Sequence, residues 1–149
     1  LALQHATLIH SVDSLKLLER LEETAASMNK DAQVLLQVNA SGEASKSGFT
    51  AEEITQEWPT ILAKSSRVRI IGLMTMAALT QDPENARPSF IKLRELKQKL
   101  AALLAGTPHT LQHLSMGMSG DYKLALSAGS TMVRIGSTIF GERTYPSAT

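Results

Sequence analysis

The chain has 149 residues, of which 43% are hydrophobic and 19% charged, and its formal net charge is +1. These values are typical of a globular protein and predict one domain over residues 1–149. The near-neutral charge and the 4% aromatic content argue against nucleic-acid binding. The lack of cysteine excludes disulfides and thiolate chemistry and fits a reducing, cytoplasmic location. No apolar run approaches the ~20 residues that span a membrane, and no basic-then-apolar leader opens the chain.

In chain order, short strand-like runs alternate with longer helical patterns. Residues 7–12 (TLIHSV) predict a first strand. Asp13 or Ser14 is placed to cap a helix. The apolar positions of this helix lie three and four residues apart, at Leu18, Leu21, Ala25 and Met28. Residues 34–39 (VLLQVN) predict a second strand by their length and β-branched ends.

Beyond a polar loop, Thr50 and Glu53 have the spacing of a capping box and predict a second helix. Pro59 is expected to disturb this helix or to start it anew. Residues 68–76 (VRIIGLMTM) predict a third strand. A third helix follows Pro88, and its apolar side comprises Phe90, Leu93, Leu96, Leu100 and Leu103.

Residues 110–116 (TLQHLSM) and 131–136 (TMVRIG) predict the fourth and fifth strands. Residues 119–127 predict a short helix between them, with Ser119 as N-cap and Gly129 in the left-handed C-terminal position. Strands joined by helical crossovers imply a parallel α/β sheet. Both a doubly wound sheet and part of a (β/α)₈ barrel fit this order, but a complete barrel needs ~250 residues and five strands cannot close one.

In both architectures, functional groups gather at the carboxyl ends of the strands. Ser119 lies at such an end, and the free N–H groups of a helix start favour an anion there. Gly136, Ser137 and Thr138 repeat this chemistry at the next strand end and predict the second half of a phosphate site. Simple helix capping at Ser119 and a Ser/Thr turn at 136–138 are the structural alternatives.

Arg134 lies inside an apolar strand, where a guanidinium needs a partner. Its partner is either a ligand or a carboxylate such as Asp13 or Asp121, and the sequence leaves both open. The four histidines show no metal-binding spacing, so no metal site is expected. Lys46 lies in a polar loop and is interpreted as a solvated residue rather than a desolvated Schiff-base lysine.

Five blocks carry a resemblance to a known family: SVDS, LLQVNASGEASKSGF, IIGLMTM, LSMGMSGDYKLAL and GSTMVRIGSTIFGER. In order and spacing they resemble the pyridoxal 5′-phosphate (PLP) homeostasis proteins, an alanine racemase-like family. The similarity runs from about Ser11 to Arg143. SMGMS and VRIGSTIFG are its most specific parts.

The resemblance implies a fold-type III PLP barrel of the TIM type that binds PLP, without an established catalytic reaction. It assigns the phosphate to Ser119, Gly136, Ser137 and Thr138, and the vicinity of the pyridine nitrogen to Arg134. Met74 and Ser115, near the ends of their strands, complete the expected cofactor-binding set. A cation near that nitrogen would keep it unprotonated and weaken the ring as an electron sink.

In the family, the Schiff-base lysine and the GEN and WHFIG segments precede the SVDS block, and none of them occurs in this sequence. The chain therefore corresponds to about the last five strands of eight, a C-terminal fragment with the phosphate side of the site. Such a sheet would expose two edges, so the missing strands could be supplied separately, two copies could pair, or the sheet could rearrange.

Two other functions remain open. One is a racemase-like PLP enzyme, which needs a second base, typically a tyrosine from a separate domain. The tyrosines of this chain are Tyr122 and Tyr145. The other is a generic phosphate-binding α/β module.

Overall fold

The computed structural model describes residues 2–43, 46–78 and 82–141. The strands in these segments are β1 (Leu8–Val12), β2 (Ala32–Gln37), β3 (Val68–Met74), β4 (His113–Met118) and β5 (Met132–Arg134). The helices are α1 (Ala2–His5), α2 (Leu15–Ser27), α3 (Ala51–Ala63), the 3₁₀ turn η1 (Pro83–Ala86), α4 (Arg87–Ala101), α5 (Tyr122–Ser127) and α6 (Ser137–Phe140).

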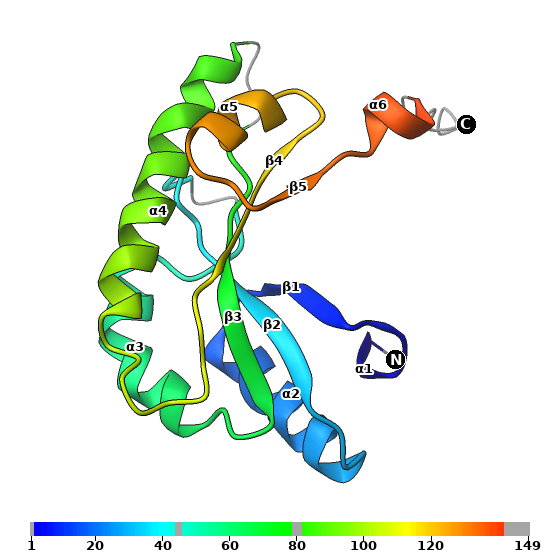
Figure 1. The fold of residues 1–149 in the computed structure, drawn as a ribbon, viewed down its shortest axis with the longest axis vertical. Helices are drawn as coiled ribbons and strands as arrows, with labels where there is room; N and C mark the ends of the chain where they lie inside the picture. Colours follow the sequence, from blue (N-terminus) through cyan, green and yellow to red (C-terminus); the bar gives the residue numbers. More distant parts are fainter. Residues whose placement is uncertain (1, 44–45, 79–81, 142–149) are drawn as a thin grey trace, which may run out of the picture.

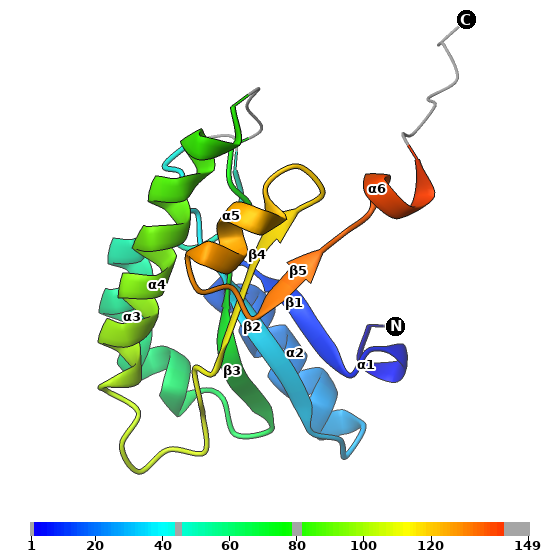
Figure 2. The same ribbon diagram turned by 45° about the horizontal axis from the view of Figure 1, so that its top comes forward.

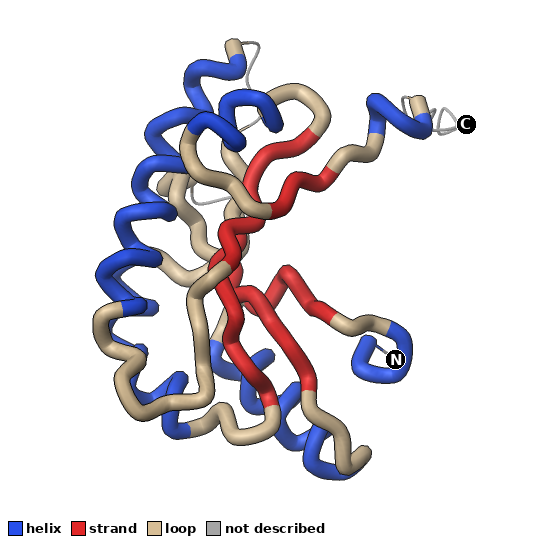
Figure 3. The backbone as a smooth tube through the Cα atoms, viewed as in Figure 1, coloured by secondary structure: helices blue, strands red, loops and turns tan. Residues whose placement is uncertain are grey.

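The described strands form one parallel sheet in the order β1-β2-β3-β4-β5. The sheet curves, with α3, α4 and α5 on its outer side, while β1 and β5 extend away from these helices (Figure 1, Figure 3). The predicted parallel α/β fold, part of a TIM-type barrel, is thus confirmed. Within the described segments, no helix is both long and apolar enough to cross a membrane.

The core lies between the sheet and its crossover helices. On β2, Val34 and Leu36 belong to this helix-packed cluster together with Val38 just after the strand. Leu35 and Gln37 alternate with them and are also buried, at 0% and 5% exposure, on the opposite face. Burial on both faces explains why the strand segments read as near-continuous apolar runs.

The second helix begins as the sequence predicts, but it does not break at Pro59. The Glu53 N–H donates to Thr50 Oγ1 over 3.0 Å and the Thr50 N–H to Glu53 Oε2 over 2.8 Å, which confirms the capping box. Pro59 lies inside the continuous helix α3. Trp58 and Ile61, on either side of it, are 1% and 0% exposed, and their burial holds the helix together across the missing N–H.

Two further helix boundaries differ from prediction. Helix α4 ends at Ala101, so Leu103 lies beyond it and is 55% exposed. Helix α5 begins at Tyr122 with Asp121 as N-cap, so Ser119 is not its cap. The left-handed glycine at the end of α5 is confirmed, since Gly129 has φ +100°. Neither α1 nor α6 is apparent from hydrophobic spacing, because each is only a single turn.

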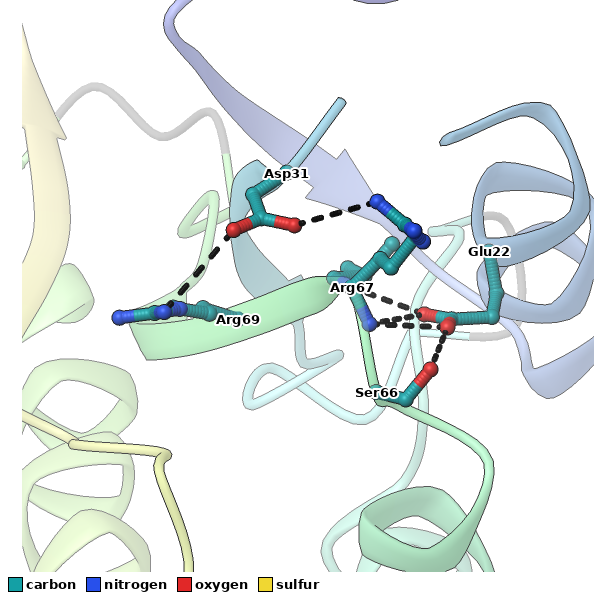
Figure 4. Close-up of polar contacts among 6 residues, drawn as sticks. Glu22, Asp31, Ser66, Arg67 and Arg69 are labelled. Atoms are coloured by element: carbon teal, nitrogen blue, oxygen red, sulfur yellow. Dashed lines mark hydrogen bonds and ion pairs between the residues drawn. The ribbon is translucent and has the colours of Figure 1, made fainter. Parts of the chain in front are cut away.

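The carboxylate of Glu22 on α2 anchors the entry to β3 (Figure 4). It accepts hydrogen bonds from the Arg67 N–H (2.8 and 3.1 Å), the Val68 N–H (2.9 Å) and the Ser66 hydroxyl. Burial alone would raise the pKa of Glu22, but these hydrogen bonds together lower it. Asp31 lies nearby between two guanidinium groups, 3.8 Å from that of Arg67 and 3.9 Å from that of Arg69.

We expect Glu22→Gln to lower the free energy of unfolding by about 1–3 kcal/mol, because backbone N–H groups would lose a charged acceptor. Chemical denaturation at neutral pH measures this change. Glu23→Gln is the matched control, because Glu23 is exposed on the same helix and should change stability by less than ~0.5 kcal/mol. Equal stability of the two variants would contradict the anchoring role of Glu22.

Candidate functional site

Ser119 and the start of α6 come together beyond the carboxyl ends of β4 and β5. Ser119 Oγ accepts a hydrogen bond from the Gly136 N–H over 3.2 Å and a weaker one from the Thr138 N–H over 3.4 Å. Ser137 begins α6, on the side of the sheet away from α3 and α4 (Figure 2). Two backbone N–H groups thus converge on the Ser119 hydroxyl, at a place where Gly136, Ser137 and Thr138 are exposed.

A tight turn after β4 gives Ser119 this position. The Met118 N–H donates to Asp121 Oδ1 over 2.6 Å, which closes the turn and leaves the Ser119 hydroxyl away from the start of α5. Gly117 has φ +94°, and a Cβ there would lie 2.5 Å from Ala125 Cβ. Only glycine fits such a close approach at positive φ. The glycine of the SMGMS block is therefore required by the close packing of β4 against α5.

An open cavity of about 600 Å³ borders this place. Its lining includes Ser119 and Thr138, together with the cationic residues Arg87 and Lys123. Arg87 is already paired with Glu84 on η1, with hydrogen bonds of 2.8 and 3.0 Å. Lys123 therefore contributes more net positive charge here than Arg87 does.

Arg134 at the end of β5 is held by neutral acceptors. Its Nη1 donates to Ser115 Oγ over 2.6 Å, and its Nη2 donates to the Thr75 carbonyl over 2.9 Å. Burial lowers the pKa of Arg134, and the charge of Asp121 partly opposes that shift. Among the described residues, no ion pair joins Arg134 to Asp13 or Asp121. The structural ion pair left open by the sequence therefore does not form there.

Ser115 contacts this guanidinium, and Met74 lies opposite Ser115 in the register of β3 and β4. Both are buried, at 0% and 4% exposure. His10 on β1 joins the same cluster, because its Nδ1 lies 2.9 Å from Ser115 Oγ. The sequence assigns His10 no partner and no role in the site. No spacing rule could have paired it with a serine 105 positions away.

Other polar residues near the strand ends serve local structure. Asn39 organises the loop after β2, since its side-chain amide donates to the carbonyls of Glu43 (2.8 Å) and Lys46 (3.2 Å). His109 is buried, and its Nδ1 accepts from the Ile70 N–H over 3.2 Å. Among the residues that the structure describes, no cluster of three or more His, Asp or Glu side chains could hold a metal ion.

A curved parallel sheet, helices on its outer face and polar groups at the carboxyl ends of its strands together define part of a (β/α) barrel. The family of the alanine racemase N-terminal domain matches residues 1–144. The chain belongs to this family.

The similar proteins include members of the family that the sequence blocks resemble. The pyridoxal phosphate homeostasis protein of Vibrio alginolyticus is 43% identical over 97% of this chain and 60% of its own length. PipY of Synechococcus elongatus, solved with PLP bound, is 32% identical with a TM-score of 0.81, over 94% of this chain and 63% of its own. The structure of PipY without PLP gives a TM-score of 0.84 at 33% identity over 94% of this chain and 64% of that chain. The chain thus spans about 60% of the length of these relatives.

An alanine racemase of Clostridium difficile shares the fold alone. Its TM-score is 0.68 at 22% identity, over 92% of this chain and 34% of its own.

Proposed function

We propose that this chain holds PLP by its phosphate, as part of a PLP homeostasis protein without a catalytic reaction of its own. The convergence of the Gly136 and Thr138 N–H groups on Ser119 Oγ carries the proposal. A phosphate oxygen would replace Ser119 Oγ as the acceptor of these two N–H groups. The hydroxyl groups of Ser119, Ser137 and Thr138 can donate to the same oxygens.

Arg134 supports the choice of PLP over a generic phosphate. Arg134 ends the strand that leads directly into the Gly136–Thr138 donors, so we expect one ligand to contact both. PLP, when bound, supplies a pyridine ring that acts as an electron sink. A cation beside the ring nitrogen disfavours its protonation, which supports binding without strong carbanion chemistry. The names of the relatives and the PLP-bound PipY structure also support PLP as the ligand.

We expect the chain to bind PLP and inorganic phosphate but to bind pyridoxal, which lacks the phosphate, at least about 10-fold more weakly than PLP, a loss of ~1.4 kcal/mol. The phosphate supplies most of the charge-assisted hydrogen bonds. Isothermal titration calorimetry with the three ligands measures the difference. Equal affinity for pyridoxal and PLP would contradict the phosphate site.

The outer edges of the sheet support association with further strands or with a second copy. In the described sheet, β1 pairs only with β2, and β5 pairs only with β4. Unpaired edges offer backbone hydrogen bonds to another strand. Light scattering after size-exclusion chromatography should report a species larger than the 16.1 kDa monomer. A monomer at all concentrations would contradict self-association.

A further inference from the structure

A hydrogen-bonded network of three side chains crosses the concave face of the sheet. His10 is on β1, Ser115 is on β4 and Arg134 is at the end of β5. The His10 Nδ1 to Ser115 Oγ distance is 2.9 Å, and the Arg134 Nη1 to Ser115 Oγ distance is 2.6 Å. Strand β1 shares no ladder with β4 or β5 in the sheet order. These side chains therefore connect strands that the backbone does not.

The chemistry of the three groups determines which one donates and which one accepts in each hydrogen bond of this network. A guanidinium can only donate, so Ser115 Oγ is the acceptor for Arg134. The hydroxyl proton of Ser115 is then available to His10 Nδ1, which favours the neutral imidazole with its proton on Nε2. Ser115 is 0% exposed, so water does not compete for its hydroxyl.

We infer that His10 is a positioning residue for Arg134, acting through Ser115, and that protonation of His10 loosens the guanidinium from the site. A protonated imidazole would present Nδ1–H to a hydroxyl that already accepts from Arg134. Two cations would then meet at one buried oxygen. The inference deepens the proposed function, because Arg134 is the group assigned to the pyridine ring.

The surroundings of His10 favour the neutral form. Burial lowers the pKa of His10, and the positive charge of Arg134 and the nearby His113 on β4 lower it further. Asp121 acts on Arg134 from the turn before α5 and partly balances its charge. Because the pKa of His10 lies below its usual value of 6.5, the neutral network persists at neutral pH and is lost as the pH falls through that lowered pKa.

The test is an NMR titration of the His10 imidazole in the ligand-free 149-residue chain, with the signal assigned by His10→Gln. We expect the wild-type ring to titrate below 6.5 with the Nε2–H tautomer in its ¹⁵N shifts. Arg134→Met should raise the pKa of His10. Ser115→Ala should abolish the tautomer preference, and Ser115→Thr, which keeps the hydroxyl, should restore it. An ordinary pKa and a mixed tautomer in the wild-type chain would overturn the inference.

A second measurement separates this inference from the proposed function. Between pH 7.5 and pH 5.5, the PLP affinity of the wild-type chain should fall by a larger factor than that of His10→Gln. The comparison with His10→Gln is needed because the phosphate also gains a proton in this range. Equal pH slopes would overturn the link between His10 and the ligand. If PLP does not bind at all while the NMR results hold, the proposed function fails and the network stands.

Discussion

Gly72→Ala should destabilise the chain more than any other single methyl addition to the sheet, by about 3 kcal/mol or more. A Cβ at Gly72 would lie 2.3 Å from the His113 carbonyl oxygen and 2.8 Å from its carbonyl carbon. These are backbone atoms of the neighbouring strand, directly opposite Gly72 in the β3–β4 register. They cannot turn aside as a flexible side chain could, so the two strands must separate.

Separation of β3 and β4 would also disturb the candidate site, because β4 and β5 connect to the rest of the sheet through β3. The hydrogen bond from Arg134 to the Thr75 carbonyl spans this junction. Gly120→Ala is the matched control, since nothing lies within 4 Å of its added Cβ. Urea denaturation should show a change below ~0.5 kcal/mol for Gly120→Ala. Similar midpoints for the two variants would show that β3 and β4 do not approach this closely.

Ser119→Asp is expected to reduce phosphate and PLP affinity by roughly 100-fold or more. The new carboxylate would accept the Gly136 and Thr138 N–H groups that Ser119 Oγ now accepts, and it would repel the phosphate. Two unit charges 4 Å apart repel by about 4 kcal/mol at an effective dielectric constant of 20, and exposure to solvent reduces this value.

The variant Ser119→Asn separates the effect of side-chain size from the effect of charge, because asparagine is nearly isosteric with aspartate but neutral. Asparagine should cost about 10-fold in affinity, because its amide cannot reproduce the compact hydroxyl donor. Calorimetric titration with inorganic phosphate and with PLP measures both variants. If Ser119→Asp binds phosphate as the wild type does, the anion does not sit at Ser119.

The order of strands and the parallel sheet could be read from the sequence because buried crossover strands are short apolar runs. The capping box at Thr50 was also predictable, since it depends on residues three apart. The continuity of α3 through Pro59 could not be predicted, because the burial of Trp58 and Ile61 stabilises the helix through tertiary contacts that local propensity ignores.

For the site, the sequence indicated Ser119, Arg134 and Gly136–Thr138, since strand ends collect functional groups. It misassigned Ser119 as a helix cap, because the bond from the Met118 N–H to Asp121 Oδ1 closes a turn there and α5 begins only at Tyr122. The link from His10 to Ser115 depends on the curvature of the sheet, which brings β1 toward β4. No local pattern encodes that distance.

A crystal structure of the chain soaked with PLP would show directly where the phosphate binds. We expect the phosphate to contact Ser119 Oγ and the N–H groups of Gly136 and Thr138, with the ring nitrogen facing Arg134. A phosphate bound elsewhere on the chain, or a ring turned away from Arg134, would contradict this expectation.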